Sequence, residues 1–185
     1  SDSGSIPLTG TSYLTFRIPC AILRHNVKGK GMNKVWIFDI DGTLADNEHR
    51  MHHLDNGKKE WDAFFAEQHK DEPYQPVIDV LHALANDRPG DAVIIVTARD
   101  ERFREETLEW LNRHIPWLSH DHMYMRPLGF RGDDDKMKVQ IIKTWLQRHP
   151  NYKVGAIFDD RHRIIDAFRE EGWYTFECNQ TRKEF

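Results

Sequence analysis

The architecture of this chain follows from ten consecutive residues, Val35-Trp36-Ile37-Phe38-Asp39-Ile40-Asp41-Gly42-Thr43-Leu44. The first four are apolar and rich in β-branched and aromatic types, which predicts a strand buried on both faces, as in a parallel sheet. The apolar run stops at Asp39, and Gly42 and Thr43 direct the chain out of the sheet. Because side chains two positions apart leave a strand on the same side, Asp39 and Asp41 are expected side by side at its carboxyl end.

This pair of carboxylates indicates a cation site. Burial of two carboxylates without a partner is costly, on the order of several kcal/mol, and Mg²⁺ is a hard divalent cation that carboxylate oxygens bind. An N-capping Asp followed by a turn Asp is the plainer interpretation of a bare Asp-x-Asp. It does not account for the apolar run before the pair and the Gly-Thr after it, so we favour the metal site.

Length and composition describe one soluble globular domain with a small appendage: 185 residues, 39% hydrophobic and 30% charged. A net charge of −4 excludes a global basic field for nucleic-acid binding but allows a local basic patch. The two cysteines, Cys20 and Cys178, are too few for a disulfide framework or a Cys-based zinc site, which favours a reducing, cytoplasmic setting. No apolar run approaches the length of a membrane span.

Residues 1–31 differ in composition from the rest. They begin with small, polar, turn-forming residues typical of a linker or of an extension added for expression. The apolar stretch 13–23 is interrupted by Arg17 and Pro19 and is not followed by a cleavage site, so we expect no signal peptide. The prediction is an extension at 1–31 that is dispensable for catalysis, followed by a catalytic domain at 32–185.

Strand and helix patterns alternate through this domain. After the first strand, strands are predicted at 92–96, 122–125, 154–158 and 173–178. Helices are predicted at 58–68, 77–85, 103–114, 136–147 and 164–171. Short connections between these segments imply a doubly wound parallel α/β sheet with helices on both faces. Core packing is expected for two apolar helix faces, namely Trp61, Phe64 and Phe65, and Val77, Val80, Leu81 and Leu84.

Polar residues follow three of the predicted strands: Asp39 and Asp41, then Thr97, then Asp159 and Asp160. They are expected to converge, because ligands of such sheets bind beyond the carboxyl ends of the strands. A carboxylate can attack phosphorus once a cation such as Mg²⁺ offsets the charge of the phosphate. We assign Asp39 as a nucleophile that forms an aspartyl-phosphate and Asp41 as the general acid and then base. Thr97 and a lysine would contact the phosphate, and Asp159 and Asp160 would complete the metal site.

These motifs resemble those of the haloacid-dehalogenase (HAD) superfamily of Mg²⁺-dependent phosphohydrolases over about residues 34–180. Asp39-Ile40-Asp41-Gly42-Thr43 resembles motif one, Thr97-Ala98-Arg99 motif two and Asp159-Asp160 motif four. The motif-three lysine is either Lys136 or Lys138, and Lys138 is in better step with the apolar face of its helix. The resemblance implies catalytic roles for Asp39, Asp41, Thr97 and Lys138, Mg²⁺ binding by Asp39, Asp41, Asp159 and Asp160, and substrate binding by Thr43, Ala98, Arg99, Arg126, Arg131 and Arg161.

A closer resemblance is to the phosphatase domain of phage-type polynucleotide kinase/phosphatases, which remove 3′-phosphates from nucleic-acid ends. The similar parts are Arg126-Pro127, the loop 131–138, Asp159-Asp160-Arg161 and Glu177-Cys178-Asn179-Gln180. The P-loop of the kinase half, Gly-x-x-x-x-Gly-Lys-Ser/Thr, is absent from this sequence. The resemblance therefore implies a phosphatase without its kinase, acting in the cytoplasm, or in the host cytoplasm if phage-encoded. A phosphatase for (deoxy)nucleoside monophosphates and a non-catalytic HAD-like binding module are the alternatives, and the intact Asp39 and Asp41 argue against the second.

The spacing of the motifs limits what covers the site. About 55 residues separate Asp41 from Thr97, and core helices occupy much of that length, so only a minimal cap is expected between them. His49, His52 and His53 in this segment are interpreted as solvated or substrate-facing rather than metal-binding. Arginines are expected to gather at the rim of the site and to give salt-sensitive binding, unless they form an ordinary charged helix face. They are Arg99, Arg102, Arg104, Arg126, Arg131 and Arg161.

Overall fold

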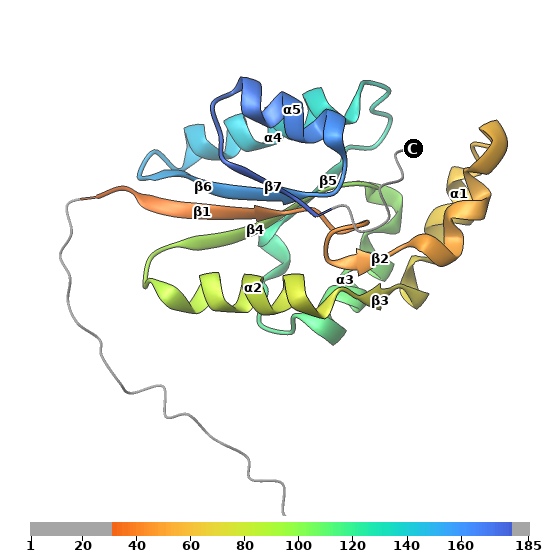
Figure 1. The fold of residues 1–185 in the computed structure, drawn as a ribbon, viewed down its shortest axis with the longest axis horizontal. Helices are drawn as coiled ribbons and strands as arrows, with labels where there is room; N and C mark the ends of the chain where they lie inside the picture. Colours follow the sequence, from red (N-terminus) through yellow and green to blue (C-terminus); the bar gives the residue numbers. More distant parts are fainter. Residues whose placement is uncertain (1–30, 179–185) are drawn as a thin grey trace, which may run out of the picture. The chain divides into compact units, whose positions relative to one another are not determined.

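The computed structural model describes residues 31–178, and these form a five-stranded parallel sheet in the order β5-β4-β1-β6-β7 (Figure 1). The strands are β1 (Asn33–Phe38), β4 (Ala92–Asp100), β5 (Met123–Arg126), β6 (Tyr152–Asp159) and β7 (Thr175–Glu177). β1 lies in the centre, where Phe38 pairs with Ile95 of β4 on one side and with Phe158 of β6 on the other. The central position explains why its sequence is an unbroken apolar run.

Helices cover both faces of the sheet (Figure 1). α2 (Gln75–Asp87) and α3 (Arg104–His114) pack against Phe38 and Ile95 on one face. α4 (Asp134–Arg148) and α5 (His162–Glu170) pack against Val35, Ile37 and Ile94 on the other face. Alternate residues of β1 thus enter two separate apolar clusters, as expected for a strand buried on both sides. The predicted doubly wound parallel α/β fold is confirmed.

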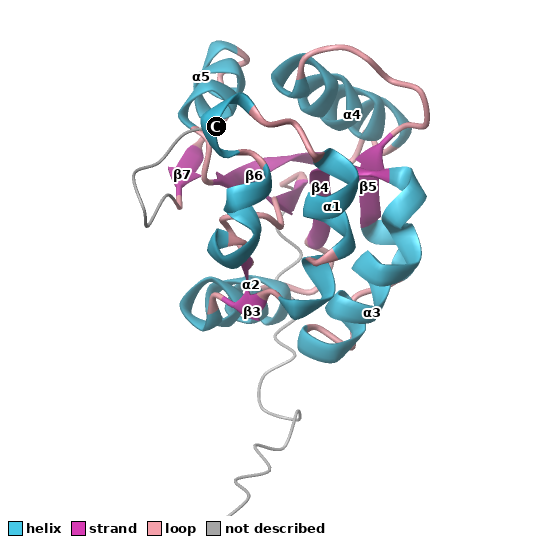
Figure 2. Cartoon of the chain, turned by 90° about the vertical axis from the view of Figure 1, so that its right-hand side faces the viewer, coloured by secondary structure: helices cyan, strands magenta, loops and turns pink. Residues whose placement is uncertain are grey.

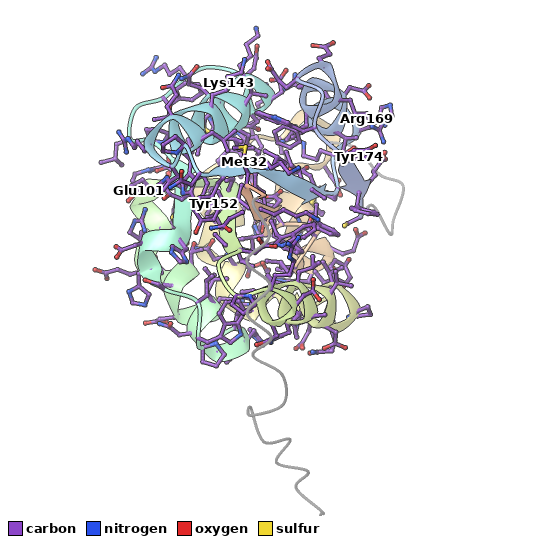
Figure 3. The ribbon with its side chains drawn as sticks, turned by 90° about the vertical axis from the view of Figure 1, so that its left-hand side faces the viewer. Met32, Glu101, Lys143, Tyr152, Arg169 and Tyr174 are labelled. Carbon is purple, nitrogen blue, oxygen red and sulfur yellow. The ribbon has the colours of Figure 1, made fainter. Side chains whose placement is uncertain are left out.

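The carboxyl ends of β1, β4 and β6 meet at one edge of the sheet, which faces the viewer in Figure 2. Figure 3 shows the opposite side, where Met32 and Tyr152 lie at the beginnings of β1 and β6. Strand order reverses around β1, since the chain adds β4 and β5 on one side before it returns to place β6 and β7 on the other. An edge of this kind is where α/β sheets bind their ligands.

A small cap is inserted between β1 and α2. It is bounded by a two-stranded antiparallel ribbon in which Ala45 of β2 (Ala45–Asp46) pairs with Pro73 of β3 (Glu72–Pro73). The cap has a core of its own, formed by Met51, Phe64 and Phe65. Between the two strands lie η1 (Glu48–His53), η2 (Asp55–Gly57), α1 (Trp61–Ala66) and η3 (Gln68–Lys70). The predicted minimal cap is confirmed, and α1 lies in front of the carboxyl edge of the sheet in Figure 2.

Several expected elements differ in detail. α1 ends at Ala66 instead of continuing to residue 68, because Gln68 is buried in a 3₁₀ turn and donates a hydrogen bond to the Phe103 carbonyl (3.3 Å). Val80 is 42% exposed, since Ile78 and Leu81 take the core-facing positions of α2. Trp61 is 45% exposed, which contradicts its expected place in the core beside Phe64 and Phe65.

The predicted extension at 1–31 lies outside the described residues except for Gly31, as do Asn179 and Gln180 at the other end. Within 31–178, no helix combines the length and the apolar character that a bilayer crossing requires.

Candidate active site

Three carboxylates and one ammonium group meet at the carboxyl ends of β1 and β6. Because Phe38 pairs with Phe158, the residues that follow them, Asp39 and Asp159, emerge next to each other. Asp160 joins them, and ligand oxygens of the three carboxylates lie within 4.8 Å of one another. Lys138, near the beginning of α4, is buried with its Nζ 2.9 Å from Asp39 Oδ2 and 2.7 Å from Asp159 Oδ2. Lys136, the other candidate, is exposed and pairs with Asp133 at 2.9 Å.

These residues fit a divalent cation. Three buried carboxylates face a single ammonium group, and Oδ1 of Asp39 and Oδ1 of Asp160 have no hydrogen-bond partner in the described part of the chain. Burial, with the charges of Asp159 and Asp41, raises the pKa of Asp39 to about 6 against the opposing effect of Lys138. Burial, with the charges of Asp159 and Asp39, raises the pKa of Asp160 to about 8. Buried oxygens that lack a positive partner are the donor set that a hard cation binds.

The turn after β1 brings its backbone against Asp160. Gly42 has a φ of +74°, and a Cβ at this position would collide with the Asp160 carboxylate. Both the backbone conformation and the close approach therefore require glycine. The Gly of the Asp-x-Asp-Gly-Thr string thus leaves room for the Asp160 carboxylate and also turns the chain.

Asp41 does not join the three carboxylates. Its side chain is held by two buried arginines, Arg99 of β4 and Arg50 of η1, whose Nη2 atoms lie 2.6 Å and 2.5 Å from Asp41 Oδ1. Although burial opposes ionisation, the charges of Arg99 and Arg50 hold the pKa of Asp41 well below its usual range. The Asp41 carboxylate thus contacts two arginines and lies outside the group of three carboxylates, unlike the metal ligand expected from the sequence.

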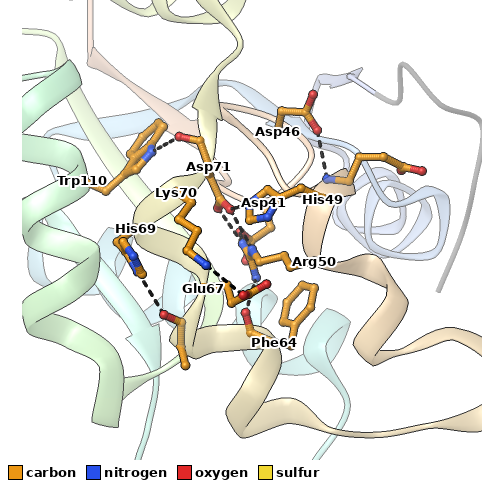
Figure 4. Close-up of polar contacts among 12 residues, drawn as sticks. Asp41, Asp46, His49, Arg50, Phe64, Glu67, His69, Lys70, Asp71 and Trp110 are labelled. Carbon is orange, nitrogen blue, oxygen red and sulfur yellow. Dashed lines mark hydrogen bonds and ion pairs between the residues drawn. The ribbon is translucent and has the colours of Figure 1, made fainter.

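A second aspartate completes this arrangement, as Figure 4 shows. Asp71 accepts hydrogen bonds from Arg50 Nε (2.8 Å) and Arg50 Nη2 (2.7 Å) and from Arg99 Nη2 (2.7 Å). Its backbone carbonyl accepts from Trp110 Nε1 (2.7 Å), and its Oδ1 lies 2.9 Å from His49 Nε2. We call Asp41, Arg50, Asp71 and Arg99 the arginine clamp. It carries two positive and two negative charges, so its buried charges balance.

Arg50 and Asp71 are the two members that sequence reasoning missed. Arg50 lies among histidines and Asp71 between Lys70 and Glu72, so both look like solvated surface charges in the sequence. Only the cap, which returns the chain through the β2–β3 ribbon, brings them to Asp41. No motif or spacing in the sequence links either residue to Asp41.

The remaining expected residues fall into three environments. Thr97 is buried within β4, which continues past the predicted end at residue 96 to Asp100, and its Oγ1 accepts from the Arg99 N–H (3.2 Å). Thr43 is buried, and its Oγ1 has no hydrogen-bond partner within the described residues. His52 is exposed, whereas His53 Nδ1 lies 3.3 Å from Glu60 Oε2 in a local hydrogen bond of the cap.

A cleft of about 600 Å³ opens over Asp39 and Asp41. The cap contributes Lys59, Trp61, Phe64 and Phe65 to its lining. The rest of the lining includes Ala98, the arginines Arg102, Arg126, Arg131, Arg161 and Arg163, and the aspartates Asp100, Asp133 and Asp134. Two of the predicted rim arginines are elsewhere. Arg99 is 0% exposed because the clamp holds it, and Arg104 is paired with Glu101 away from the cleft. Arg126 and Arg161 both contact Asp134, which offsets part of their charge.

Comparison with known proteins agrees with this geometry. The family described as "Polynucleotide kinase PNKP phosphatase domain" matches residues 33–183. A chain of the Pnkp1/Rnl/Hen1 RNA repair complex is similar, with a TM-score of 0.61 and 26% identity, over 79% of this chain and 42% of that chain. A second structure of the Pnkp1/Rnl/Hen1 complex gives a TM-score of 0.61 and 27% identity, over 80% of this chain and 47% of that chain. This chain therefore spans less than half the length of those chains.

A more distant likeness concerns the fold alone. The class C acid phosphatase from Bacillus anthracis with tungstate bound has a TM-score of 0.57 and 16% identity, over 83% of this chain and 69% of that chain.

Proposed function

The chain belongs to the family of polynucleotide kinase PNKP phosphatase domains within the HAD superfamily, and from this membership we propose that it removes 3′-phosphates from nucleic-acid ends. One observation carries the proposal at the level of the site. Asp39 and Lys138 line a cleft together with several arginines, and the buried Asp159 and Asp160 lie directly behind them. The part of the lining formed by Asp39 and Lys138 suits a phosphate, and the arginines suit the rest of a polyanionic substrate.

Asp39 is the proposed nucleophile. Lys138 holds Oδ2 of Asp39, while Oδ1 has no hydrogen-bond partner among residues 31–178. In the first step a bond forms between an Asp39 oxygen and phosphorus, and the bond from phosphorus to the 3′ oxygen breaks. In the second step a water oxygen attacks phosphorus, inorganic phosphate leaves and the Asp39 carboxylate is restored.

Asp41 is proposed to move the proton in both steps. It would donate a proton to the leaving 3′ oxygen and afterwards take one from the attacking water. The clamp keeps this carboxylate ionised before substrate arrives, because Arg99 and Arg50 hold its pKa low. An incoming phosphate adds negative charge next to Asp41, which favours its protonation when a proton is needed. The clamp also fixes the direction of the carboxylate, so Arg50, Asp71 and Arg99 act as positioning residues.

Asp39, Asp159 and Asp160 are the residues that would hold a divalent cation, for which we propose Mg²⁺. When bound, the cation offsets the negative charge of the phosphate as a second anion approaches. Lys138 contributes a compact positive charge beside Asp39, and its pKa is raised because Asp159 and Asp39 outweigh the effect of burial. The hydroxyls of Thr43 and Thr97 and the backbone at Ala98 are the proposed phosphate contacts.

The test is phosphate release from 3′-phosphorylated DNA and RNA oligonucleotides, with and without Mg²⁺, beside a panel of nucleoside monophosphates. We expect Mg²⁺-dependent release from an oligonucleotide at a higher kcat/KM than from any mononucleotide, and its loss in Asp39→Asn. Turnover of mononucleotides alone would move the function to nucleotide metabolism and leave the chemistry in place. Activity that survives in Asp39→Asn would refute the assignment of the nucleophile.

A further inference from the structure

The cap places a partly exposed tryptophan in the same cleft as the proposed nucleophile. Trp61 begins α1, is 45% exposed and lines the cleft together with Asp39 and Asp41. Figure 2 shows α1 in front of the edge where β4 and β6 end. A large aromatic side chain in this position is neither part of the core nor remote from the reacting groups.

The Trp61 ring is supported from behind. It stacks on Phe65, with ring centroids 6.2 Å apart and 25° between the planes, and meets Phe64 edge-on at 6.0 Å and 86°. Phe64 and Phe65 are themselves buried. A ring that is supported by buried neighbours and is still 45% exposed presents its remaining surface to a ligand with little loss of side-chain freedom.

This support is connected to the catalytic groups. The Arg50 guanidinium lies over the Phe64 ring, 4.0 Å from its centroid, and its Nη1 donates to the Phe64 carbonyl (3.3 Å). Because Arg50 also holds Asp41, the aromatic group keeps a fixed position relative to the proton-moving carboxylate. The cleft, at about 600 Å³, has the size of a small-molecule site and holds more than a phosphate group.

We propose that Trp61 is the stacking platform for the nucleobase of the terminal nucleotide whose 3′-phosphate reacts with Asp39. The inference rests on the proposed function and names the part of the substrate that the cap recognises. Every base has a flat aromatic face, so the platform selects nucleotides over other phosphate esters without selecting a sequence. Lys59 and Arg102 also line the cleft and supply positive charge for the adjoining backbone phosphate, with part of the Arg102 charge offset by Asp62 (2.9 Å) and Asp100 (3.1 Å).

The experiment compares two substrates and three variants. One substrate is a 3′-phosphorylated oligonucleotide, and the other is the same oligonucleotide with an abasic terminal nucleotide that carries the 3′-phosphate. The variants are Trp61→Ala, Trp61→Phe and Trp117→Ala. Trp117 is the matched control, because it is 46% exposed but donates its Nε1 hydrogen bond to His82 and lies outside the cleft lining.

The wild-type enzyme should have a lower KM for the substrate with a terminal base, by about 5- to 150-fold, which is the range that stacking of one base provides. Trp61→Ala should abolish this difference by raising the KM of the base-containing substrate while kcat stays within about twofold. Trp61→Phe should retain part of the difference, and Trp117→Ala all of it.

Two results would overturn the inference. One is a Trp61→Ala enzyme that keeps the full preference for the terminal base. The other is a loss of kcat/KM by the same factor on both substrates in Trp61→Ala and Trp61→Phe, which would mean that Trp61 only supports the cap. If the wild type acts on 3′-mononucleotides and not on oligonucleotides, the proposed function fails. The platform is then tested by the same comparison between a 3′-nucleoside monophosphate and abasic deoxyribose 3-phosphate.

Discussion

Replacement of Arg50 by methionine tests the arginine clamp, because it removes one of two positive charges from a buried group of four. Arg50 makes hydrogen bonds to Asp41 Oδ1 (2.5 Å), to both oxygens of Asp71 (2.8 and 2.7 Å) and to the Phe64 carbonyl (3.3 Å). Methionine fills a similar volume but leaves the carboxylates of Asp41 and Asp71 with Arg99 as their one arginine partner in the clamp, beside the His49 contact of Asp71. Loss of one partner from a buried ion pair costs about 3–5 kcal/mol. At about 2–4 °C per kcal/mol for a domain of this size, Tm should fall by about 6–20 °C.

The assay is urea denaturation at 25 °C and pH 7, with the free energy of unfolding extrapolated to water. Arg104→Met is the matched control, since Arg104 pairs with Glu101 at the partly exposed surface and should contribute less than about 1 kcal/mol. The loss in Arg50→Met should also shrink as pH falls below about 4. Folding lowers the pKa of Asp41. A carboxylate of this kind contributes its full stabilisation above its unfolded pKa, and the contribution is lost as pH falls from there toward the folded pKa. A loss below about 1 kcal/mol at pH 7 would refute the reasoning that the clamp stabilises the fold.

Three further predictions concern the metal, the pH and the substrate. Gly42→Ala should weaken Mg²⁺ binding measured by calorimetry, because its Cβ would displace Asp160. Gly129→Ala is the control and should leave Mg²⁺ binding unchanged, because Gly129 has the same φ of +74° and no atom lies near its Cβ. Without metal, the raised pKa values of Asp39, about 6, and Asp160, about 8, mean that the folded chain binds more protons than the unfolded chain between about pH 4 and 8. The free energy of unfolding should therefore fall as pH rises through this window, and Asp160→Asn should make it depend less on pH. Mg²⁺ should raise Tm more at pH 8 than at pH 5. A wild-type free energy of unfolding that does not change with pH would contradict the burial of these carboxylates. Arg131→Gln should lower the salt slope of oligonucleotide binding to an Asp39→Asn enzyme by about 1, whereas an unchanged slope would remove Arg131 from the interface.

The convergence of the proposed catalytic carboxylates was predictable because it follows from the backbone. Asp39 and Asp159 each end an apolar run, and two such runs in one parallel sheet bring their carboxyl ends to the same edge. Lys138 was predictable from its step with the apolar face of α4, which turns it toward the sheet. In these cases the periodicity of a regular element determines where the side chain points.

The clamp was not predictable, since it depends on how an irregular segment folds. Arg50 and Asp71 belong to 3₁₀ turns and their ends, where no period relates one position to another. Arg99 was expected at the rim because an arginine after a strand is normally solvated. Its guanidinium can be buried because Asp41 and Asp71 lie beside it. Trp61 was misplaced for a similar reason, because α1 is too short to bury all three aromatic side chains.

The β2–β3 ribbon determines how this scaffold can vary. Ala45 pairs with Pro73 and Asp46 with Glu72, and the Tyr74 N–H donates to the Leu44 carbonyl (2.8 Å), so the chain enters and leaves the cap at neighbouring points. A segment joined in this way can be lengthened or shortened without disturbing the sheet. The substrate range of such an enzyme can therefore change by exchange of the cap as a module, on the condition that each replacement again supplies an arginine and a carboxylate to Asp41.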